Sequence, residues 1–320
     1  MIQLEQIKNF YPPLLCENTD SVKHILKEYI QLMVLDFLSS SVYVRKITFI
    51  GGTNLRLTKG IDRFSEDLDF DCKDFSKQEF TEMTDEVIRF LNRSGLNVEP
   101  RDRDNARLTA YRRSIYFPEL LFDMDLSRHR EERFLLKIEM QNQETDYCPT
   151  VTNIQGCGFF FPFPVPSAGV LCSMKIAAML ARAKGRDFYD LMFLLSQTKP
   201  DYGFLEKRYG ICNLQDLQEA TTKLLMITDL NIKKRDFEHL LFSKSNSEKI
   251  LHFSEFMQTL TFLPQRNSNR AFICSASILL LFFSIVLAYL PKFFDKLAQT
   301  DLLVLYDFGM KVLDISQNRL

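Results

Sequence analysis

Alternating carboxylates are the first feature of this sequence that could do chemistry. Asp67, Asp69 and Asp71 alternate with the apolar residues Leu68 and Phe70. In a β-strand, residues two apart project to the same side, so the three carboxylates are expected on one face of a strand. Carboxylates this close repel one another unless a cation lies between them or water solvates them well. The pattern therefore predicts a site for a hard divalent cation.

A glycine turn lies a short distance upstream. An apolar run ends in Gly51, Gly52 and Thr53, which is typical of a strand that turns into a tight loop with exposed backbone N–H groups. Two glycines alone more often mark an ordinary turn. Next to a carboxylate cluster, however, the N–H groups and the Thr53 hydroxyl suit the phosphates of a nucleotide. Together the two features indicate nucleotide chemistry, such as metal-dependent phosphoryl or nucleotidyl transfer.

Such chemistry uses two or three carboxylates around ions that lie about 4 Å apart, and the third carboxylate normally comes from a neighbouring strand. Glu139 lies between apolar residues in a predicted strand over 133–141. Alone it would be read as a surface residue, but beside the upstream acids we predict a ligand. The predicted metal ligands are therefore Asp67, Asp69 and Glu139. Asp71 is expected to drift off the end of its strand.

A basic group follows much later in the chain. On a continuous helix, Lys175, Arg182 and Arg186 would share one face, because offsets of seven and eleven residues return to nearly the same side. A basic stripe is often only solvated surface. Near a triphosphate, these cations would instead neutralise the charge that develops during transfer. Asp187 and Asp190 could orient the lysine or an incoming hydroxyl, and the spacing does not choose between them.

The elements that must position these residues can be outlined from periodicity. Apolar spacing predicts helices over 18–40 and 76–93 and a helix that begins at residue 167, and short apolar runs predict strands over 46–50, 107–117 and 133–141. The Gly/Phe/Pro-rich stretch 156–166 is predicted to be a loop or an edge strand. Residues 204–262 look mostly helical. We predict three parts: a core domain over 1–166, a helical domain over 167–264 and an apolar tail over 265–320.

The composition excludes some classes of protein. The 320 residues are 46% hydrophobic and carry 40 basic against 41 acidic side chains, so a nucleic-acid surface would have to be local. Seven cysteines without a CxxC pair and four histidines argue against a zinc site and suit a reducing cytoplasm. The N-terminus lacks the basic-then-apolar run of a signal peptide. We therefore expect a cytoplasmic location.

The tail contains one long uncharged stretch. Residues 271–291 carry no charge and are long enough to cross a hydrocarbon core, which takes about 20 residues. The same stretch could instead be a buried helix that closes the second domain. Membrane association through 271–291 and a buried helix are both open predictions at this point.

Four motifs in order give the chain a resemblance to a known family. They are residues 27–29 (Lys-Glu-Tyr), 49–55 (Phe-Ile-Gly-Gly-Thr-Asn-Leu), 63–70 (Arg-Phe-Ser-Glu-Asp-Leu-Asp-Phe), and 175–178 together with 184–191. Over roughly residues 20–260 the chain resembles the AbiEii nucleotidyltransferases, the toxins of type IV toxin–antitoxin (abortive infection) systems. The resemblance implies an α+β fold of the polymerase-beta-like nucleotidyltransferase type, with a mixed sheet, flanking helices and a helical C-terminal region.

The resemblance also implies roles for single residues. Gly51, Gly52 and Thr53 would bind nucleotide phosphates, with Lys175, Arg182 and Arg186 as further nucleotide-binding residues. The metal would be Mg²⁺, as two ions held by Asp67, Asp69 and Glu139. The catalytic residues would be Asp67, Asp69, Lys175, Asp187 and Asp190.

The implied activity is transfer of a nucleotide from an NTP to an acceptor, with tRNA or another RNA as the expected acceptor. A cognate antitoxin encoded nearby would restrain the toxin, and phage defence is the implied setting. Two alternatives stay open in the sequence. One is transfer to a small molecule or a protein hydroxyl, and the other is a non-catalytic, membrane-associated protein that binds nucleotide.

Overall fold

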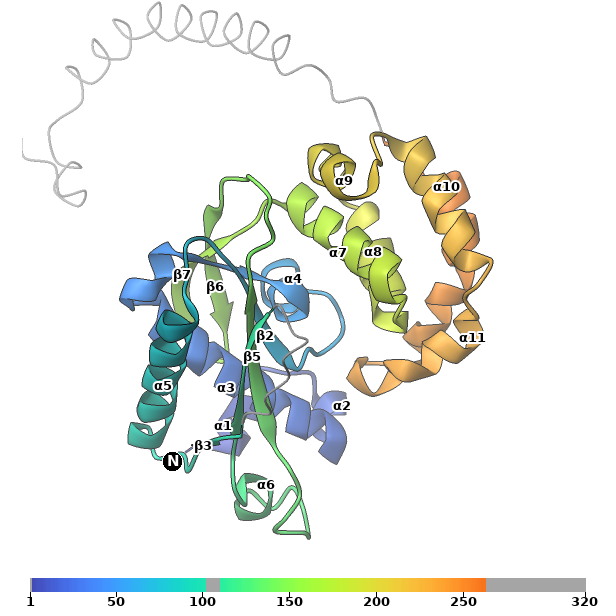
Figure 1. Cartoon of the computed structure of the whole chain (residues 1–320). Coiled ribbons are helices and arrows are strands. Elements are labelled where there is room, and N and C mark those ends of the chain that lie inside the picture. Colours follow the sequence, from blue (N-terminus) through green and yellow to red (C-terminus); the bar gives the residue numbers. More distant parts are fainter. Residues whose placement is uncertain (1, 102–109, 263–320) are drawn as a thin grey trace, which may run out of the picture. The chain divides into compact units, whose positions relative to one another are not determined.

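The computed structural model describes residues 2–101 and 110–262 (Figure 1). The described residues as far as Leu260 form one compact unit. Its strands are β1 (Ile47–Ile50), β2 (Asp67–Cys72), β3 (Glu99–Pro100), β4 (Tyr111–Tyr116), β5 (Leu135–Gln141), β6 (Thr150–Gly156) and β7 (Phe159–Val165). The α-helices that precede β7 are α1 (Leu4–Lys8), α2 (Pro13–Cys16), α3 (Thr19–Ser39), α4 (Gly51–Lys59), α5 (Lys77–Arg93) and α6 (Leu120–Asp123), with a 3₁₀ turn η1 (Val42–Arg45).

The described strands form one mixed sheet and one hairpin. The order in the five-stranded sheet is β1-β2-β5-β4-β3, with β2 and β5 parallel and the other neighbours antiparallel. β6 and β7 pair with each other in a separate antiparallel sheet. The predicted mixed sheet with flanking helices is confirmed. Residues 159–165 are strand rather than loop, and Pro162 and Pro164 are tolerated because each strand of a two-stranded sheet has a free edge.

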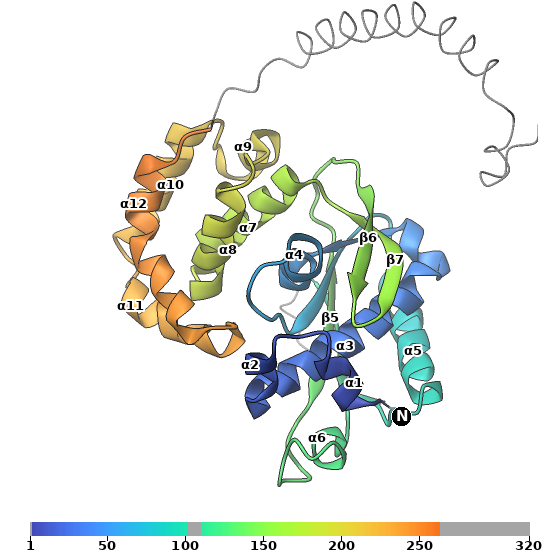
Figure 2. The same ribbon diagram turned by 180° about the vertical axis from the view of Figure 1, so that it is seen from behind.

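The two long helices of the core begin where the sequence predicts. The Asn18 side chain accepts a hydrogen bond of 2.8 Å from the N–H of Asp20 and caps α3. Ser76 and Glu79 form a reciprocal capping box at the start of α5. Both helices lie next to the strands (Figure 2). Local capping chemistry therefore fixes where these helices start.

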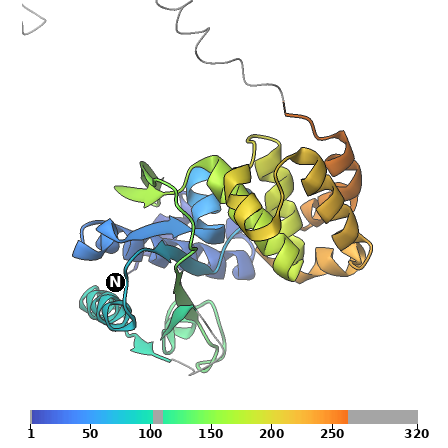
Figure 3. The same cartoon turned by 45° about the horizontal axis from the view of Figure 1, so that its top comes forward.

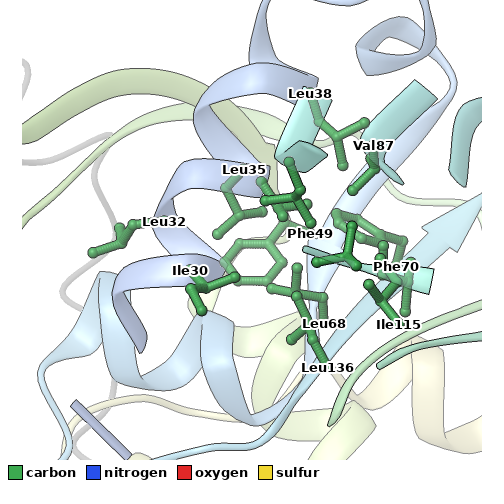
Figure 4. Close-up of a cluster of buried hydrophobic side chains, with 14 of the residues drawn as sticks. Ile30, Leu32, Leu35, Leu38, Phe49, Leu68, Phe70, Val87, Ile115 and Leu136 are labelled. Atoms are coloured by element: carbon green, nitrogen blue, oxygen red, sulfur yellow. The ribbon is translucent and has the colours of Figure 1, made fainter. Parts of the chain in front are cut away.

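The main hydrophobic core lies on one face of the sheet. Leu68 and Phe70 of β2 project to this face and are 0% and 1% exposed. Phe49 of β1 lies opposite Phe70 in the register, and Figure 4 shows it among side chains from α3 and the strands. Truncation of a buried Phe to Ala costs about 3–5 kcal/mol. Because side chains alternate along β2, the same register turns Asp67, Asp69 and Asp71 to the opposite face.

The chain changes from strands to helices between β7 and α7 (Figure 3). The α-helices after this point are α7 (Ala168–Arg182), α8 (Gly185–Leu195), α9 (Tyr202–Tyr209), α10 (Leu214–Leu225), α11 (Leu230–Lys233) and α12 (Phe253–Thr259). Three 3₁₀ segments, η2 (Lys234–Asp236), η3 (Glu238–Leu240) and η4 (Lys244–His252), lie between α11 and α12. Their position agrees with the helical pattern predicted from residue 167 onward. Whether 1–166 and 167–264 are separate domains stays a prediction.

No helix within 2–101 and 110–262 has the length and apolar character needed to cross a membrane. The uncharged segment 271–291 and the rest of the predicted tail over 265–320 lie outside the described residues.

Candidate active site

The carboxylates lie side by side across two strands. Asp67 and Asp69 are on β2, and Glu139 is on the parallel strand β5 directly opposite Asp69. Residues opposite each other in adjacent strands project to the same face, so the register brings the three predicted metal ligands together. The prediction that Asp71 drifts off the end of its strand is wrong, because Asp71 stays in β2 opposite Gln141.

Asp71 has a structural task instead. It is 4% exposed, and its carboxylate accepts hydrogen bonds from the Gln143 backbone N–H (2.8 Å) and the Tyr147 hydroxyl (2.5 Å). These bonds hold the connection that follows β5. Asp71 was left out of the predicted metal ligands because it was expected to lie beyond the strand. It lies on the strand, and its carboxylate oxygens instead accept hydrogen bonds from Gln143 and Tyr147.

The surroundings of Asp69 and Asp67 disfavour their ionised forms. Burial, together with the charges of Asp67 and Glu139, raises the pKa of Asp69 to about 6. Burial also raises the pKa of Asp67; Lys137 opposes this shift and Glu139 adds to it. A positive charge placed among these oxygens would relieve the repulsion. The arrangement therefore favours cation binding.

The Gly51-Gly52 turn touches this acidic row. Gly51 has a φ of +80°, and a Cβ atom there would lie 2.0 Å from Asp69 Oδ2. At Gly52, a Cβ would lie 2.6 Å from the Ser65 hydroxyl oxygen. Glycine is required at Gly51 both by its left-handed backbone and by this close approach. Helix α4 starts at the turn, so its first N–H groups, which lack partners inside the helix, lie beside the carboxylates.

The neighbouring Thr53 does not face the site. It is fully buried, and its hydroxyl donates a 2.5 Å hydrogen bond to the Asp67 carbonyl. The Asn54 side chain likewise donates to the Phe49 carbonyl at 2.7 Å. These two side chains fasten α4 to β1 and β2, so the structure places Thr53 in the framework of the turn rather than on its nucleotide side.

Lys175 reaches the site from α7. Its Nζ donates to Asp190 Oδ2 at 2.7 Å, and Arg63 contacts both oxygens of the same carboxylate at 2.6 Å. Asp190 is fully buried, and burial opposes its ionisation, but the charges of Arg63 and Lys175 outweigh burial and lower its pKa to about 2. Asp190 is thus a fixed counter-ion that positions two cations.

Asp187 has a similar environment. It is 0% exposed, and its oxygens accept hydrogen bonds from Arg182 Nε (3.0 Å) and Nη2 (2.8 Å) and from the Lys184 backbone N–H (3.2 Å). The last bond caps α8. The pocket lining therefore includes neither Asp187 nor Asp190, but each contacts a basic residue that lines it.

The predicted stripe of three cations does not lie on one helix. Helix α7 ends at Arg182, Ala183 has a left-handed φ of 44°, and α8 begins at Gly185. Arg186 is the next residue. Its charge offsets part of the rise that burial causes in the pKa of Asp67 and Asp69. Tertiary packing therefore brings Lys175, Arg182 and Arg186 to one pocket without a continuous helix.

That pocket has a volume of about 500 Å³. The acids that line it are Asp67, Asp69 and Glu139. The bases contributed by α7 and α8 and their junction are Lys175, Arg182, Lys184 and Arg186. The bases contributed from elsewhere are Arg63, Arg112, Lys137 and Arg208, which the sequence analysis did not select. In the described part of the chain, the pocket is thus an acidic row surrounded by cations, which suits a nucleoside triphosphate and a metal ion.

Two of the acids already have cationic neighbours. Arg112 Nε lies 2.9 Å from Glu139 Oε1, and Lys137 Nζ lies 3.7 Å from Asp67 Oδ1. As the side chains are placed, the described residues contain no cluster of three His, Cys, Asp or Glu close enough to hold a metal. Even so, the oxygen donors of Asp67 and Asp69, whose pKa values are raised chiefly by burial, fit a hard divalent cation. Asp67 and Asp69 fit best, and Glu139 would have to turn from Arg112.

Solved structures of other proteins resemble this chain, and the first of those described below shows the same fold. MenT4, a nucleotidyltransferase toxin from Mycobacterium tuberculosis, superposes with a TM-score of 0.51 at 18% identity, over 82% of this chain and 91% of that one. JHP933 from Helicobacter pylori has a TM-score of 0.46 at 18% identity, over 79% of this chain and 97% of that one. A putative nucleotidyltransferase from H. pylori has a TM-score of 0.48 at 19% identity, over 74% and 93%.

Curated protein sequences give no match. The family model described as "Nucleotidyl transferase AbiEii toxin, Type IV TA system" matches residues 34–236, which is well over half of the chain. The matched range contains the glycine turn, the acidic row and the α7–α8 cations. The chain therefore belongs to the AbiEii family of nucleotidyltransferase toxins from type IV toxin–antitoxin systems.

Proposed function

We propose that the enzyme moves a nucleotide from an NTP to an RNA acceptor, with tRNA as the expected class, and that it needs a divalent cation, expected to be two Mg²⁺ ions. The observation that carries this proposal is the contact between the Gly51 turn and Asp69. A Cβ at Gly51 would lie 2.0 Å from Asp69 Oδ2, so the phosphate-binding backbone and the carboxylate touch. A phosphate bound at the turn and a metal bound at Asp69 would therefore be direct neighbours.

In the proposed reaction, different residues of the pocket would have different roles. The first N–H groups of α4, with Lys175 and Arg186, would hold the triphosphate and neutralise its charge. Asp67 and Asp69, with Glu139 if it turned, would hold Mg²⁺, which supplies Lewis-acid stabilisation at the reacting phosphate. The acceptor hydroxyl oxygen would bond to the α-phosphorus, the bond from that phosphorus to the pyrophosphate oxygen would break, and the hydroxyl proton would pass to solvent. Asp190 and Asp187 would position Lys175 and Arg182.

Family membership also brings an antitoxin partner and an NTP donor. We propose that expression without the antitoxin inhibits growth through the transfer reaction and that phage defence is its setting. A cytoplasmic location stays a prediction.

The test is a transfer assay with each of the four labelled NTPs, total RNA and Mg²⁺. We expect label in RNA with the natural chain and with Asp71→Asn, because the Asp71 carboxylate does not line the pocket and is held by the Gln143 backbone N–H and the Tyr147 hydroxyl. Asp69→Asn should abolish both the transfer and the growth inhibition. Label in protein or in a small molecule would point to another acceptor, and full toxicity of Asp69→Asn would contradict the proposal.

A further inference from the structure

One row of residues crosses the sheet through the site. The register places Ile50 of β1, Asp69 of β2, Glu139 of β5 and Arg112 of β4 opposite one another in turn. Neighbouring strands lie about 4.8 Å apart, so the carboxylates occupy the middle of this row. The Gly51 turn lies at one end of the row and Arg112 at the other. The site therefore has two chemically distinct flanks.

Two cations near the carboxylates on each flank differ in exposure. On the flank of α7 and α8, the side chains of Lys175 and Arg63 are 8% and 1% exposed and are held by Asp190. On the strand flank, the side chains of Arg112 and Lys137 are 40% and 43% exposed. Lys175 and Arg63 are thus fixed around a counter-ion, whereas Arg112 and Lys137 are open to a large ligand, as Arg182 at the end of α7 also is (43% exposed).

The two open cations of the strand flank are close to each other. Arg112 pairs with Glu139 in the register, and Lys137 precedes Glu139 by two residues on β5. Diagonal neighbours of this kind lie about 7–8 Å apart, so neighbouring phosphates of one strand could contact both. Arg112 need not leave Glu139 to do so, since a guanidinium has five N–H donors. The pair is thus arranged for a polyanion and not for a single compact anion.

In-line displacement at phosphorus requires the attacking and leaving oxygens on opposite sides of the reacting phosphate. If the triphosphate binds at the Gly51 turn and the α7–α8 cations, pyrophosphate leaves on that flank. The acceptor hydroxyl must then arrive from the flank of β4 and β5.

We infer that Arg112 and Lys137 form the acceptor subsite of this enzyme and bind backbone phosphates next to the 3′-hydroxyl of the RNA that receives the nucleotide. The inference rests on the proposed function and assigns its acceptor side. It makes these two residues determinants of acceptor affinity, separate from the residues that hold the donor. A protein acceptor, in contrast, would gain little from two cations spaced for successive phosphates.

The test compares Arg112→Gln, Lys137→Gln and the double variant with Arg112→Lys and a control, Arg89→Gln. Arg89 is an exposed arginine of α5, which packs against the opposite face of the sheet. Rates of transfer to purified total tRNA are measured at pH 8, where Asp69 is ionised in every variant. Binding of a fluorescently labelled single-stranded RNA oligonucleotide is measured in parallel by anisotropy, because this readout does not depend on activity.

We expect the double variant to raise the KM for RNA and weaken oligonucleotide binding by about tenfold or more, with the KM for NTP and kcat within about threefold of the natural enzyme. The salt dependence of log Kd should become shallower by about 0.7 for each contact removed. Arg112→Lys should recover part of the affinity, and Arg89→Gln should change nothing.

The outcomes separate the two proposals. If the natural enzyme labels RNA and the double variant has an unchanged KM for RNA, the acceptor assignment is overturned while the proposed function stands. A raised KM for NTP, or a loss confined to kcat, would also overturn it, since the residues would then serve the donor or the chemistry. If the natural enzyme neither binds nor labels RNA and labels protein instead, both proposals fail.

Discussion

Two pairs of aspartates, Asp67/Asp69 on β2 and Asp187/Asp190 on α8, share a residue type and have opposite surroundings. Burial and neighbouring carboxylates raise the pKa of Asp69 to about 6. Asp190 is more deeply buried, yet the charges of Arg63 and Lys175 overcome burial and lower its pKa to about 2. The cations near the first pair do not offset burial and the neighbouring carboxylates, whereas the two cations that contact Asp190 do offset its burial. Surroundings, more than position within a motif, decide which carboxylate can accept a cation.

The largest effect on activity should come from removing the charge of Asp69, in the first pair. We expect Asp69→Asn to lower the rate of nucleotide transfer by about 10³-fold or more, because a metal-binding oxygen and its charge are lost. The melting temperature should stay the same or rise, since the change removes repulsion with Asp67 and Glu139. Initial rates and thermal melts of the same preparations check this. Loss of folding in Asp69→Asn would remove the contrast between the two pairs.

The second pair should respond in the opposite way. Asp190→Asn leaves Arg63 and Lys175 buried without a full counter-charge, and removal of one partner from a buried ion pair costs about 3–5 kcal/mol. Urea unfolding should show this loss. A matched control is Asp146→Asn, because the Asp146 side chain is 96% exposed and its ion pair with Lys73 should contribute about 1 kcal/mol or less. If Asp190→Asn were as stable as the control, Asp190 would not be a structural counter-ion.

Acidity should separate the two pairs without mutation. The raised pKa of Asp69 means that its ionised form is lost as the pH falls through about 6. Asp190 has a lowered pKa, so its contribution to stability is complete above its ordinary pKa and is lost only as the pH falls toward about 2. Between about pH 6 and pH 4.5, Mn²⁺ affinity should therefore fall by up to about tenfold per pH unit while the fold persists. Electron paramagnetic resonance measures Mn²⁺ binding, and circular dichroism measures the folded fraction. If Mn²⁺ binding and the folded fraction were lost in parallel, the expectation would be contradicted.

Much of the framework followed from local pattern. The period-two alternation around Asp67 and Asp69 predicted a strand with one acidic face, and apolar spacing predicted helices over 18–40 and 76–93, where α3 and α5 lie. These features depend on neighbours in the chain, so a single sequence carries them. The α7 helix, which starts after its Ser167 cap, was predicted for the same reason.

What could not be predicted depends on partners that are far apart in sequence. Asp190 is a counter-ion only because Arg63, 127 positions earlier, meets it. Glu28 is likewise buried against Arg56 of α4 and the Tyr11 hydroxyl. Nothing local distinguishes a buried, paired acid from a catalytic one. The alternation of charged and apolar residues in 133–141 did offer a signal for Lys137, since residues two apart share a face with Glu139.

The smallest effect concerns the link between the glycine turn and the first pair. Thr53 was predicted to bind nucleotide, but its hydroxyl donates to the Asp67 carbonyl inside the protein. We expect Thr53→Val to lose about 1 kcal/mol of stability, the net worth of one hydrogen bond, and Thr53→Ser to retain it. In both variants the KM for NTP should stay within about twofold of the natural value. A tenfold higher KM in Thr53→Val alone would instead mean that the hydroxyl turns to the phosphates when nucleotide binds. The acidic row would then be coupled to donor binding through the Asp67 backbone, whereas Asp190 would be coupled to it through Lys175.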